Sequence, residues 1–449
     1  MKNCETRWKK TGFIWGIYGL AVAVLCIYYS LKHLSFGVMP GRAAHLFSLL
    51  DKDILAVFEY FQIQPDHNVA YFIYCWLYGS FFREVFGMVL SPERIFKSIW
   101  AIMMCVPFVL VTLWSWKLYK KSALSFVAPW LFFYCTYPVS FAFRDECTWF
   151  MSWTVYTGFL LLCLLKQENG EIVPKGSMWI AMLLCIGWGN VGRLHASLGI
   201  TCLLIFMLVL TCYRKGTFRH TGNHLKRLVV SIGVILSVYV SFTGIIPKLL
   251  YAAYGMEGTV NYQAVWHTMY IGLGWFNPPN DKKYKEDKSA RCIVYNDSCA
   301  GHFVKSRDAS VKYLSPEYME ILRHEIWRIM REEPRFFISS YSGKFMWILF
   351  EILRIHWKFM LFMIGWAGFH KWRGNSIQFS SKEIYFALVF LCFFDFSFPM
   401  IAVPRFTYMQ GCLGAYAMLQ FVFAMDLLRN VNVSKLSLLL ARYDRNREG

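Results

Sequence analysis

The stretch "SIWAIMMCVPFVLVTLWSW", residues 98–116, contains no charged side chain and lies between Lys97 and Lys117. An α-helix of about 20 mainly apolar residues is long enough to span the hydrocarbon core of a bilayer. Comparable apolar runs recur along the 449-residue chain, of which 57% is hydrophobic, 19% aromatic and only 17% charged. An average soluble domain is about one quarter charged. The sequence therefore predicts an all-α integral membrane protein with several transmembrane helices.

About ten runs are expected to cross the membrane. They lie at about 13–31, 98–116, 123–141, 147–165, 178–192, 194–212, 228–247, 345–366, 384–400 and 405–427. The first run is long and is not followed by a small-residue cleavage site, so it is interpreted as a retained span and not as a signal peptide. The run at 69–90 contains Arg83 and Glu84. Charge inside a span is costly, so this segment is predicted to lie along the membrane interface.

The formal net charge of +19 is distributed in short clusters between the apolar runs. The clusters lie at 117–121, 214–227, 371–373 and 429–447. Such placement is typical of cytoplasmic loops beside anionic lipid headgroups, so membrane lipids are the expected partner of these residues and nucleic acid is not. With ten spans, both termini and all these clusters are predicted to face the cytoplasm.

Two long segments then fall on the extracytoplasmic side, at about 32–97 and 248–343. The second contains a charged stretch and an amphipathic pattern from Pro316 to about Arg331, which predicts an interfacial helix. The chain is expected to divide into three parts. These are an N-terminal transmembrane module at 1–247, an extracytoplasmic region at 248–343, and C-terminal transmembrane helices with a cytoplasmic tail at 344–449.

Isolated charged or polar residues on the short extracytoplasmic turns are candidate functional residues, because charge near bilayer depth is costly and is usually functional. They are Arg144, Asp145, Glu146, Arg193, His195 and Arg405. The alternative for each residue is an anchoring role at a helix end. Their location on one face, together with the two long loops, favours a site.

The stretch "AVWHTMYIGLGWFNPPND", residues 264–281, combines aromatic residues with two glycines around His267. It is too polar to span a membrane and too aromatic for an ordinary solvent loop. An interfacial aromatic belt is the structural alternative. A re-entrant or interfacial turn that lines a cavity between lipid and water is the functional one, because non-helical backbone at that depth is tolerated only in such places.

Most of the 14 cysteines lie in or beside hydrophobic segments, where they act as small apolar side chains. Cys292 and Cys299 lie in the long second loop, and an oxidising compartment favours a disulfide between them. The sequence contains no metal-ligand spacing, P-loop, GxGxxG or GxSxG pattern, so neither nucleotide hydrolysis nor serine-hydrolase chemistry is indicated.

Three passages, in this order, resemble the GT-C membrane glycosyltransferases, the class that includes protein O-mannosyltransferases and lipid A aminoarabinose transferases. "YPVSFAFRDECTWFMSW" (137–153) followed by "IGWGNVGRLHASLGI" (186–200) is similar to a unit in which Arg-x-Glu at one extracytoplasmic turn precedes Arg at the next. "EIWRIMREEPRFFISSYSGKF" (325–345) is similar to the amphipathic helix that leads into a late span, and "VPRFTYMQGCLGAYAML" (403–419) to the opening of the last span. Residues 266–274 resemble the Trp-His-x-x-Tyr-x-Gly-Leu-Gly segment of some bacterial members.

The resemblance implies a GT-C-like bundle in the cytoplasmic membrane with its active site facing the periplasm or the outside. Such an enzyme moves a sugar from a polyprenyl-phosphate donor to a lipid, glycan or protein acceptor. A carboxylate or imidazole takes the proton of the acceptor. The family usually carries an acidic pair after the first span, where this chain has Gly41-Arg42. The proton acceptor is therefore expected among Asp51, Asp53, Asp145, Glu146 and His267.

The same chemistry assigns the binding residues. Fixed arginines stabilise the charge on the departing phosphate, and Arg144, Arg193 and Arg405 are the candidates, with His195 beside them. Trp266 and Tyr270 are expected to stack on sugar faces, and Asn277 and His267 to bind hydroxyls. No cofactor or metal is expected, because the lipid-linked sugar is itself the substrate.

Two alternatives stay open. An O-antigen polymerase or ligase also combines many spans with a large loop, but it transfers glycans from a diphosphate carrier. A secondary transporter is the alternative without catalysis; the absence of a visible two-half sequence repeat argues against it.

Overall fold

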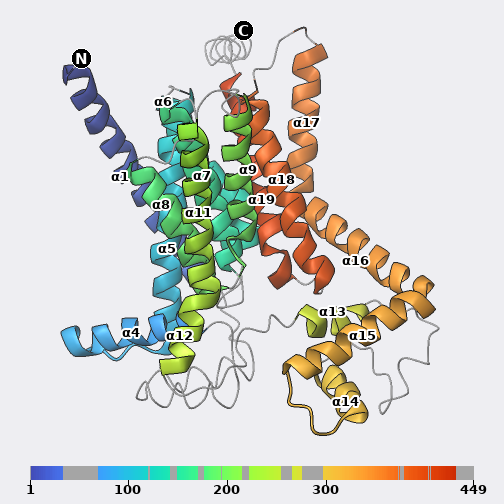
Figure 1. The fold of residues 1–449 in the computed structure, drawn as a ribbon. Coiled ribbons are helices and arrows are strands. Elements are labelled where there is room, and N and C mark those ends of the chain that lie inside the picture. Colours follow the sequence, from blue (N-terminus) through green and yellow to red (C-terminus); the bar gives the residue numbers. More distant parts are fainter. Residues whose placement is uncertain are drawn as a thin grey trace.

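The computed structural model describes residues 2–33, 69–119, 122–141, 149–169, 176–193, 195–214, 222–253, 265–275, 297–372, 374, 379–402, 404 and 406–430. Every element in these segments is helical (Figure 1). In chain order the first half comprises α1 (Lys2–His33), α4 (Val69–Phe86), α5 (Pro92–Tyr119), α6 (Ser122–Thr136), η1 (Tyr137–Phe141), α7 (Trp149–Asn169), α8 (Ser177–Gly192) and α9 (Leu198–Arg214). The second half comprises α11 (Gly222–Val240), η2 (Ser241–Ile245), α12 (Ile246–Ala253), α13 (Val265–Leu273), α14 (Asp297–Arg307), α15 (Pro316–Glu332), α16 (Pro334–Arg354), α17 (Trp357–Trp372), α18 (Lys382–Ile401) and α19 (Phe406–Arg429).

Seven of the described helices are long and apolar enough to cross a membrane. They contain the stretches Thr11–Lys32, Glu93–Tyr119, Trp149–Lys166, Leu225–Ile245, Pro334–Arg354, Lys382–Ile401 and Tyr408–Arg429. Two shorter apolar helices, α8 and α9, lie among them. The chain is therefore a multi-pass membrane protein whose described residues form only helices, as the composition predicts. The count of ten crossings stays a prediction.

The helix α4 has a different orientation from the bundle helices. It runs across the end of the bundle and not along it (Figure 1), and it is not among the seven candidate spans. Its Tyr71 and Cys75 are buried, whereas Phe81 and Val85 are exposed. The segment at 69–90 therefore does not run along the bundle, and its predicted position in the membrane interface stays a prediction.

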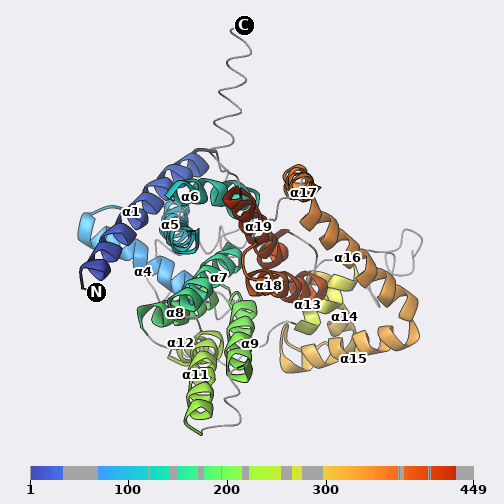
Figure 2. The ribbon, with the colours of Figure 1, turned by 90° about the horizontal axis from the view of Figure 1, so that it is seen from above.

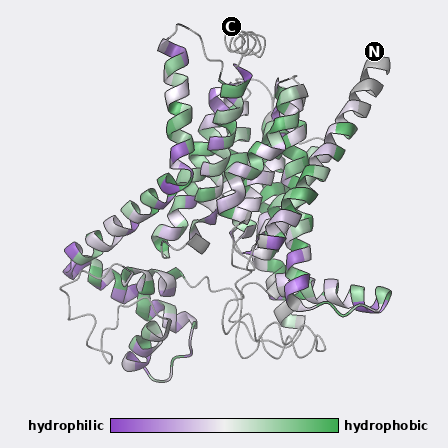
Figure 3. Ribbon diagram, turned by 180° about the vertical axis from the view of Figure 1, so that it is seen from behind, coloured by the Kyte–Doolittle hydropathy of each residue, from purple (hydrophilic) through white to green (hydrophobic). Residues whose placement is uncertain are grey.

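Viewed from above, α7 and α19 occupy the middle of the bundle, and α1 and α11 lie at its edge (Figure 2). Burial follows this order, because α7 and α19 are buried over most of their length and α1 and α11 expose most of theirs. Hydrophobic residues predominate along the bundle helices (Figure 3), and many large apolar side chains are exposed, as expected for helices that contact lipid.

One predicted span is divided in the structure. The run at 345–366 is not one helix, because α16 ends at Arg354 and α17 begins at Trp357. Between them His356 has a φ of 53°, a left-handed conformation in which an α-helix cannot continue. The side chain of Gln420 on α19 donates a hydrogen bond of 2.9 Å to the carbonyl oxygen of Ile355. This bond satisfies an acceptor that the helix break leaves without its intrahelical partner.

One end of the bundle is joined by a buried carboxylate, Asp426 on α19. It accepts hydrogen bonds from the hydroxyls of Tyr119 (2.9 Å) and Tyr385 (2.7 Å) and from the backbone and side chain of Ser380 (both 2.6 Å). These contacts bring the end of α5, the start of α18 and the end of α19 together. We call this end of the molecule the latch end.

The opposite end carries a small helical unit formed by α13, α14 and α15, which we call the insert (Figure 1). Helix α15 begins at Pro316 after Ser315, whose side chain accepts a hydrogen bond from the backbone of Tyr318. A Ser cap followed by Pro is a favourable helix start. The predicted amphipathic helix from Pro316 is confirmed, with its apolar face against α13 and α14.

Candidate functional site at the insert end of the bundle

A carboxylate is buried inside the bundle near the insert end. Asp395 on α18 is 3% exposed. Glycines of two other helices face it: a Cβ on Gly199 of α9 would lie 2.6 Å from its Oδ1, and a Cβ on Gly411 of α19 would lie 2.7 Å from its Oδ2. Only glycine leaves room for the carboxylate at these positions. Within the described parts of the chain, no residue forms a hydrogen bond or an ion pair with Asp395.

A layer of cationic and aromatic side chains lies next to this carboxylate. The Arg193 guanidinium carbon lies 5.0 Å from the centre of the Tyr408 ring. The ring of His195 stacks on that of Phe398, with 6.3 Å between centroids and 14° between planes. These two contacts place the Arg193 guanidinium at the start of α19 and the His195 imidazole at the end of α18.

The register of three helices relates the layer to Asp395. Tyr408 is three residues before Gly411, Phe398 is three residues after Asp395, and His195 is four residues before Gly199. The first two steps are each about one helical turn toward the insert end. Phe398 and Tyr408, which contact His195 and Arg193, therefore lie about one turn from Asp395 and Gly411 along their helices.

The turn between α8 and α9 holds this layer. His195 has a φ of 87°, a conformation that is uncommon outside glycine and clusters at functional sites. Its Nδ1 lies 3.4 Å from the hydroxyl of Tyr239 on α11. Asn190 on α8 stabilises the turn, because its side-chain oxygen accepts a hydrogen bond of 3.2 Å from the backbone N–H of Ser197.

The same turn retains unused hydrogen-bonding groups. The side-chain nitrogen of Asn190 and the hydroxyl of Ser197 are buried and have no hydrogen-bond partner among the described residues. Buried polar groups are normally satisfied by protein, water or ligand. The region beside Asp395 therefore has the capacity to bind a polar group.

A buried lysine joins the insert to the bundle. Lys344 on α16 is fully buried, and its Nζ donates hydrogen bonds to the carbonyl oxygens of Met400 (3.1 Å) and Ala402 (2.8 Å) at the end of α18. These are carbonyl groups that a helix end leaves unpaired. Gly272 of α13 lies against Ala402, and Ser340 on α16 donates a hydrogen bond of 2.9 Å to the carbonyl oxygen of Leu273.

Three predicted site residues lie within the insert. His267 is buried, and its Nδ1 is 2.9 Å from the hydroxyl of Tyr318. Tyr270 is buried and stacks on Phe303, and Trp266 packs against the same hydrophobic cluster. These contacts hold the insert together, and the structure does not bring the three residues into the layer of Arg193 and His195. Their predicted roles in catalysis and sugar binding stay predictions.

The other predicted site residues lie outside the described residues. They are Asp51, Asp53, Arg144, Asp145, Glu146, Asn277 and Arg405. Arg405 directly precedes α19, three residues before Tyr408. Of the predicted disulfide pair, Cys299 is disulfide-bonded, and Cys292 is not among the described residues.

Asp395 and Lys344 were not among the site residues predicted from the sequence. Both had a visible signal, because each is a charged residue within an apolar helical segment, "LCFFDFSF" (391–398) and "SGKFMWILF" (342–350). Intramembrane ionisable residues are rare and are functional candidates by default. The charge pattern of the turns drew attention to the helix ends and away from the helix interiors.

The arrangement has a defined chemical capacity. The Asp395 carboxylate can accept a proton, and the Arg193 guanidinium can bind and stabilise an anion. Both effects are stronger where water is excluded. Comparison of the chain with protein-family models, with curated proteins and with solved structures finds no match.

Proposed function

We propose that this protein is a membrane glycosyltransferase that moves a sugar from a polyprenyl-phosphate donor to a lipid, glycan or protein acceptor. The observation that carries the proposal is the buried carboxylate of Asp395 on α18, whose Phe398 stacks on His195, while Arg193 contacts Tyr408 of the adjacent α19. Transfer from a phosphate-linked donor requires a group that takes a proton and a group that stabilises the anion of the leaving phosphate. Asp395 and Arg193 supply these two kinds of group within the bundle, and the lipid-linked donor is proposed to enter from the bilayer.

Arg193 is the proposed phosphate-binding residue. Its guanidinium lies on the ring of Tyr408, so its position is defined before a substrate binds. Arginine binds phosphate oxygens in bidentate fashion, which lysine does not reproduce. Arg405 and Arg144 are proposed to complete the anion site, as the resemblance to the GT-C class implies.

The insert has the features of an extracytoplasmic cover. Its amphipathic helix α15 leads directly into the candidate span α16, as the resemblance implies. The latch end carries Lys117, Lys166, Arg214, Lys226 and Arg429 at helix ends. By the positive-inside rule, the latch end is proposed to face the cytoplasm. The insert then faces the periplasm or the outside, where acceptors are found.

The direct experiment is transfer by the purified protein in lipid nanodiscs. Radiolabelled polyprenyl-phosphate sugars are supplied together with a lipid and glycan extract as acceptor. Transfer of label to the acceptor is expected for one class of donor, and no transfer from the matching polyprenyl diphosphate. Transfer from the diphosphate alone supports the polymerase or ligase alternative. Absence of transfer from either donor contradicts the proposal.

A secondary transporter is the second candidate function. The observation that favours it is the break between α16 and α17 at Ile355 and His356, because discontinuous helices form the binding sites of many transporters. Uptake of a labelled solute by proteoliposomes, in the absence of any group transfer, is the result that supports this candidate.

A further inference from the structure

We infer that Asp395 is the proton acceptor of the transfer reaction and that its carboxylate binds the acceptor hydroxyl. The inference rests on the proposed function, and it assigns a residue that the sequence does not offer as the base.

A second buried carboxylate in the same protein provides the comparison. Asp426 is fully buried at the latch end, and four donor groups of Tyr119, Ser380 and Tyr385 satisfy it. Asp395 is buried to nearly the same degree, and none of the described residues donates to it. A buried polar group without a hydrogen-bond partner is costly. The protein itself supplies the hydrogen-bond donors of the structural carboxylate, Asp426. We infer that the donor to Asp395 comes from a ligand.

The surroundings of Asp395 are shaped around its carboxylate. Gly199 and Gly411 come from helices far apart in the sequence, and both leave out the atoms that would contact its two oxygens. The two glycines therefore enclose the Asp395 carboxylate but donate no hydrogen bond to its oxygens. A hydroxyl is the ligand group that fits, because it donates one proton to a carboxylate oxygen and its own oxygen remains free to react.

The order of the residues along the helices suits the reaction. Phe398, which stacks on His195, follows Asp395 by about one helical turn, and Tyr408, which contacts Arg193, precedes Gly411 by the same step. We place the anomeric carbon between the carboxylate and a phosphate bound by Arg193. A hydroxyl held by Asp395 then faces the carbon from which the phosphate departs.

The step balances without another reactant. The acceptor oxygen forms a bond to the anomeric carbon as its proton passes to Oδ1 or Oδ2 of Asp395. The bond from the anomeric carbon to the phosphate oxygen breaks, and its electron pair leaves with the polyprenyl phosphate. The guanidinium of Arg193 stabilises the resulting negative charge, and Asp395 later releases the proton to water.

The test compares Asp395→Asn and Asp395→Ala with the wild-type protein in the nanodisc transfer assay. Loss of transfer by about 100-fold or more is expected for both variants, as for removal of a general base. Azide is an anionic nucleophile that needs no base, and the alanine variant leaves room for it. Added azide is expected to restore turnover of donor in Asp395→Ala, with a glycosyl azide as product.

The matched control is Asp426→Asn, which removes a buried carboxylate of similar burial far from the site. This variant is expected to lose stability and to retain the transfer rate of its folded fraction, whereas Asp395→Asn is expected to unfold at no lower temperature than the wild type. Transfer by Asp395→Asn within about tenfold of wild type, or folded Asp395→Ala that azide does not rescue, overturns the assignment and leaves the proposed function intact. A wild-type protein without transfer overturns both.

Discussion

Gly272 of the insert lies directly against the carbonyl oxygen of Ala402 at the end of α18: a Cβ at residue 272 would lie only 2.2 Å from that oxygen and 2.8 Å from Nζ of Lys344. The same carbonyl accepts a hydrogen bond of 2.8 Å from Lys344. The close approach therefore joins the insert, α16 and α18 at one point. It also explains why the aromatic stretch at 264–281 contains a glycine at this position.

Gly272→Ala is expected to weaken this junction, because the added methyl group displaces Ala402 or Lys344. Overpacking of this kind typically costs about 1–3 kcal/mol. Gly301→Ala on α14 is the matched control, since a Cβ there would meet only Tyr313 at 3.9 Å. Thermal unfolding and limited proteolysis of the insert in detergent measure the difference. Equal proteolysis of the two variants would contradict the proposed junction.

Asp426→Asn is expected to destabilise the latch end. An amide replaces one acceptor oxygen with a donor, which faces the donors of Tyr119, Tyr385 and Ser380. Each unsatisfied buried group costs about 1–3 kcal/mol. Glu383→Gln is the control, because Glu383 pairs with Lys166 and the exposed Arg214, and such surface pairs contribute about 0–1 kcal/mol. A lower midpoint temperature in differential scanning fluorimetry is expected for the first variant and a smaller change for the second.

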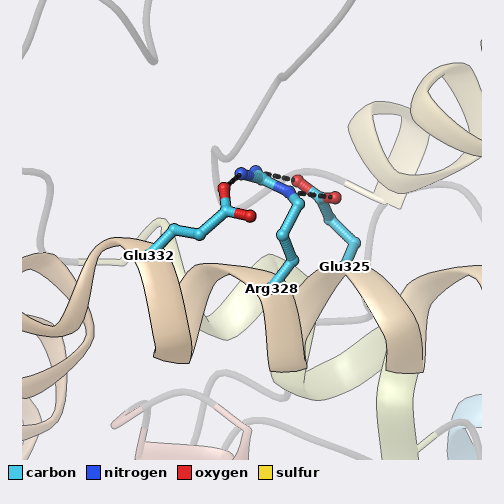
Figure 4. Close-up of polar contacts among 3 residues, drawn as sticks. All are labelled: Glu325, Arg328 and Glu332. Carbon is cyan, nitrogen blue, oxygen red and sulfur yellow. Dashed lines mark hydrogen bonds and ion pairs between the residues drawn. The ribbon is translucent and has the colours of Figure 1, made fainter.

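Arg328→Ala is expected to loosen α15 (Figure 4). Arg328 donates to both oxygens of Glu325, at 2.8 and 2.6 Å, and to Glu332 at 2.5 Å. The hydrogen bonds that Arg328 donates to Glu325 raise the pKa of the Arg328 guanidinium above its ordinary value. Removal of the guanidinium leaves Glu325, which is 5% exposed, as a buried carboxylate without this partner. Loss of about 1–3 kcal/mol of insert stability is expected.

Arg323→Ala provides the comparison for this variant, because Arg323 pairs with Glu320 and both side chains are largely exposed. Its effect is expected to stay below about 1 kcal/mol. Hydrogen exchange of the amides in residues 316–332 reports local opening in both variants. Equal protection in the two would show that the Arg328 network adds nothing to the stability of the insert.

Arg193→Lys is expected to raise the KM for the lipid-phosphate donor at least tenfold and to lower kcat/KM further. Lysine keeps the charge but loses the bidentate geometry and the stacking on Tyr408. Arg214→Lys at the latch end is the control, since it changes the same chemistry at a pair with Glu383. Steady-state transfer rates measured against donor concentration give KM and kcat/KM for both variants. An unchanged KM in Arg193→Lys would assign Arg193 to anchoring of the helix end.

The positions of the helices could be read from the sequence because their determinants are local. Apolar runs near 98–116 and 384–400 contain the information for a spanning helix within themselves, and the pattern after Pro316 predicts α15 to within a residue. The break at His356 could not be read in this way. No proline or glycine marks it, and the acceptor that it exposes is satisfied by Gln420, which is 65 residues further along the chain.

The candidate site shows the same division. The sequence by itself determined that charged residues would gather at helix ends, and it predicted Arg193 and His195 as site residues. Only the tertiary structure decided that Asp395 lies between Gly199 and Gly411, and that His267 contacts Tyr318 within the insert. Hydropathy is a property of each segment alone, whereas the close approach of α9, α18 and α19 depends on side-chain packing among helices. In a chain whose apolar segments are so alike, that packing selects which few polar residues meet.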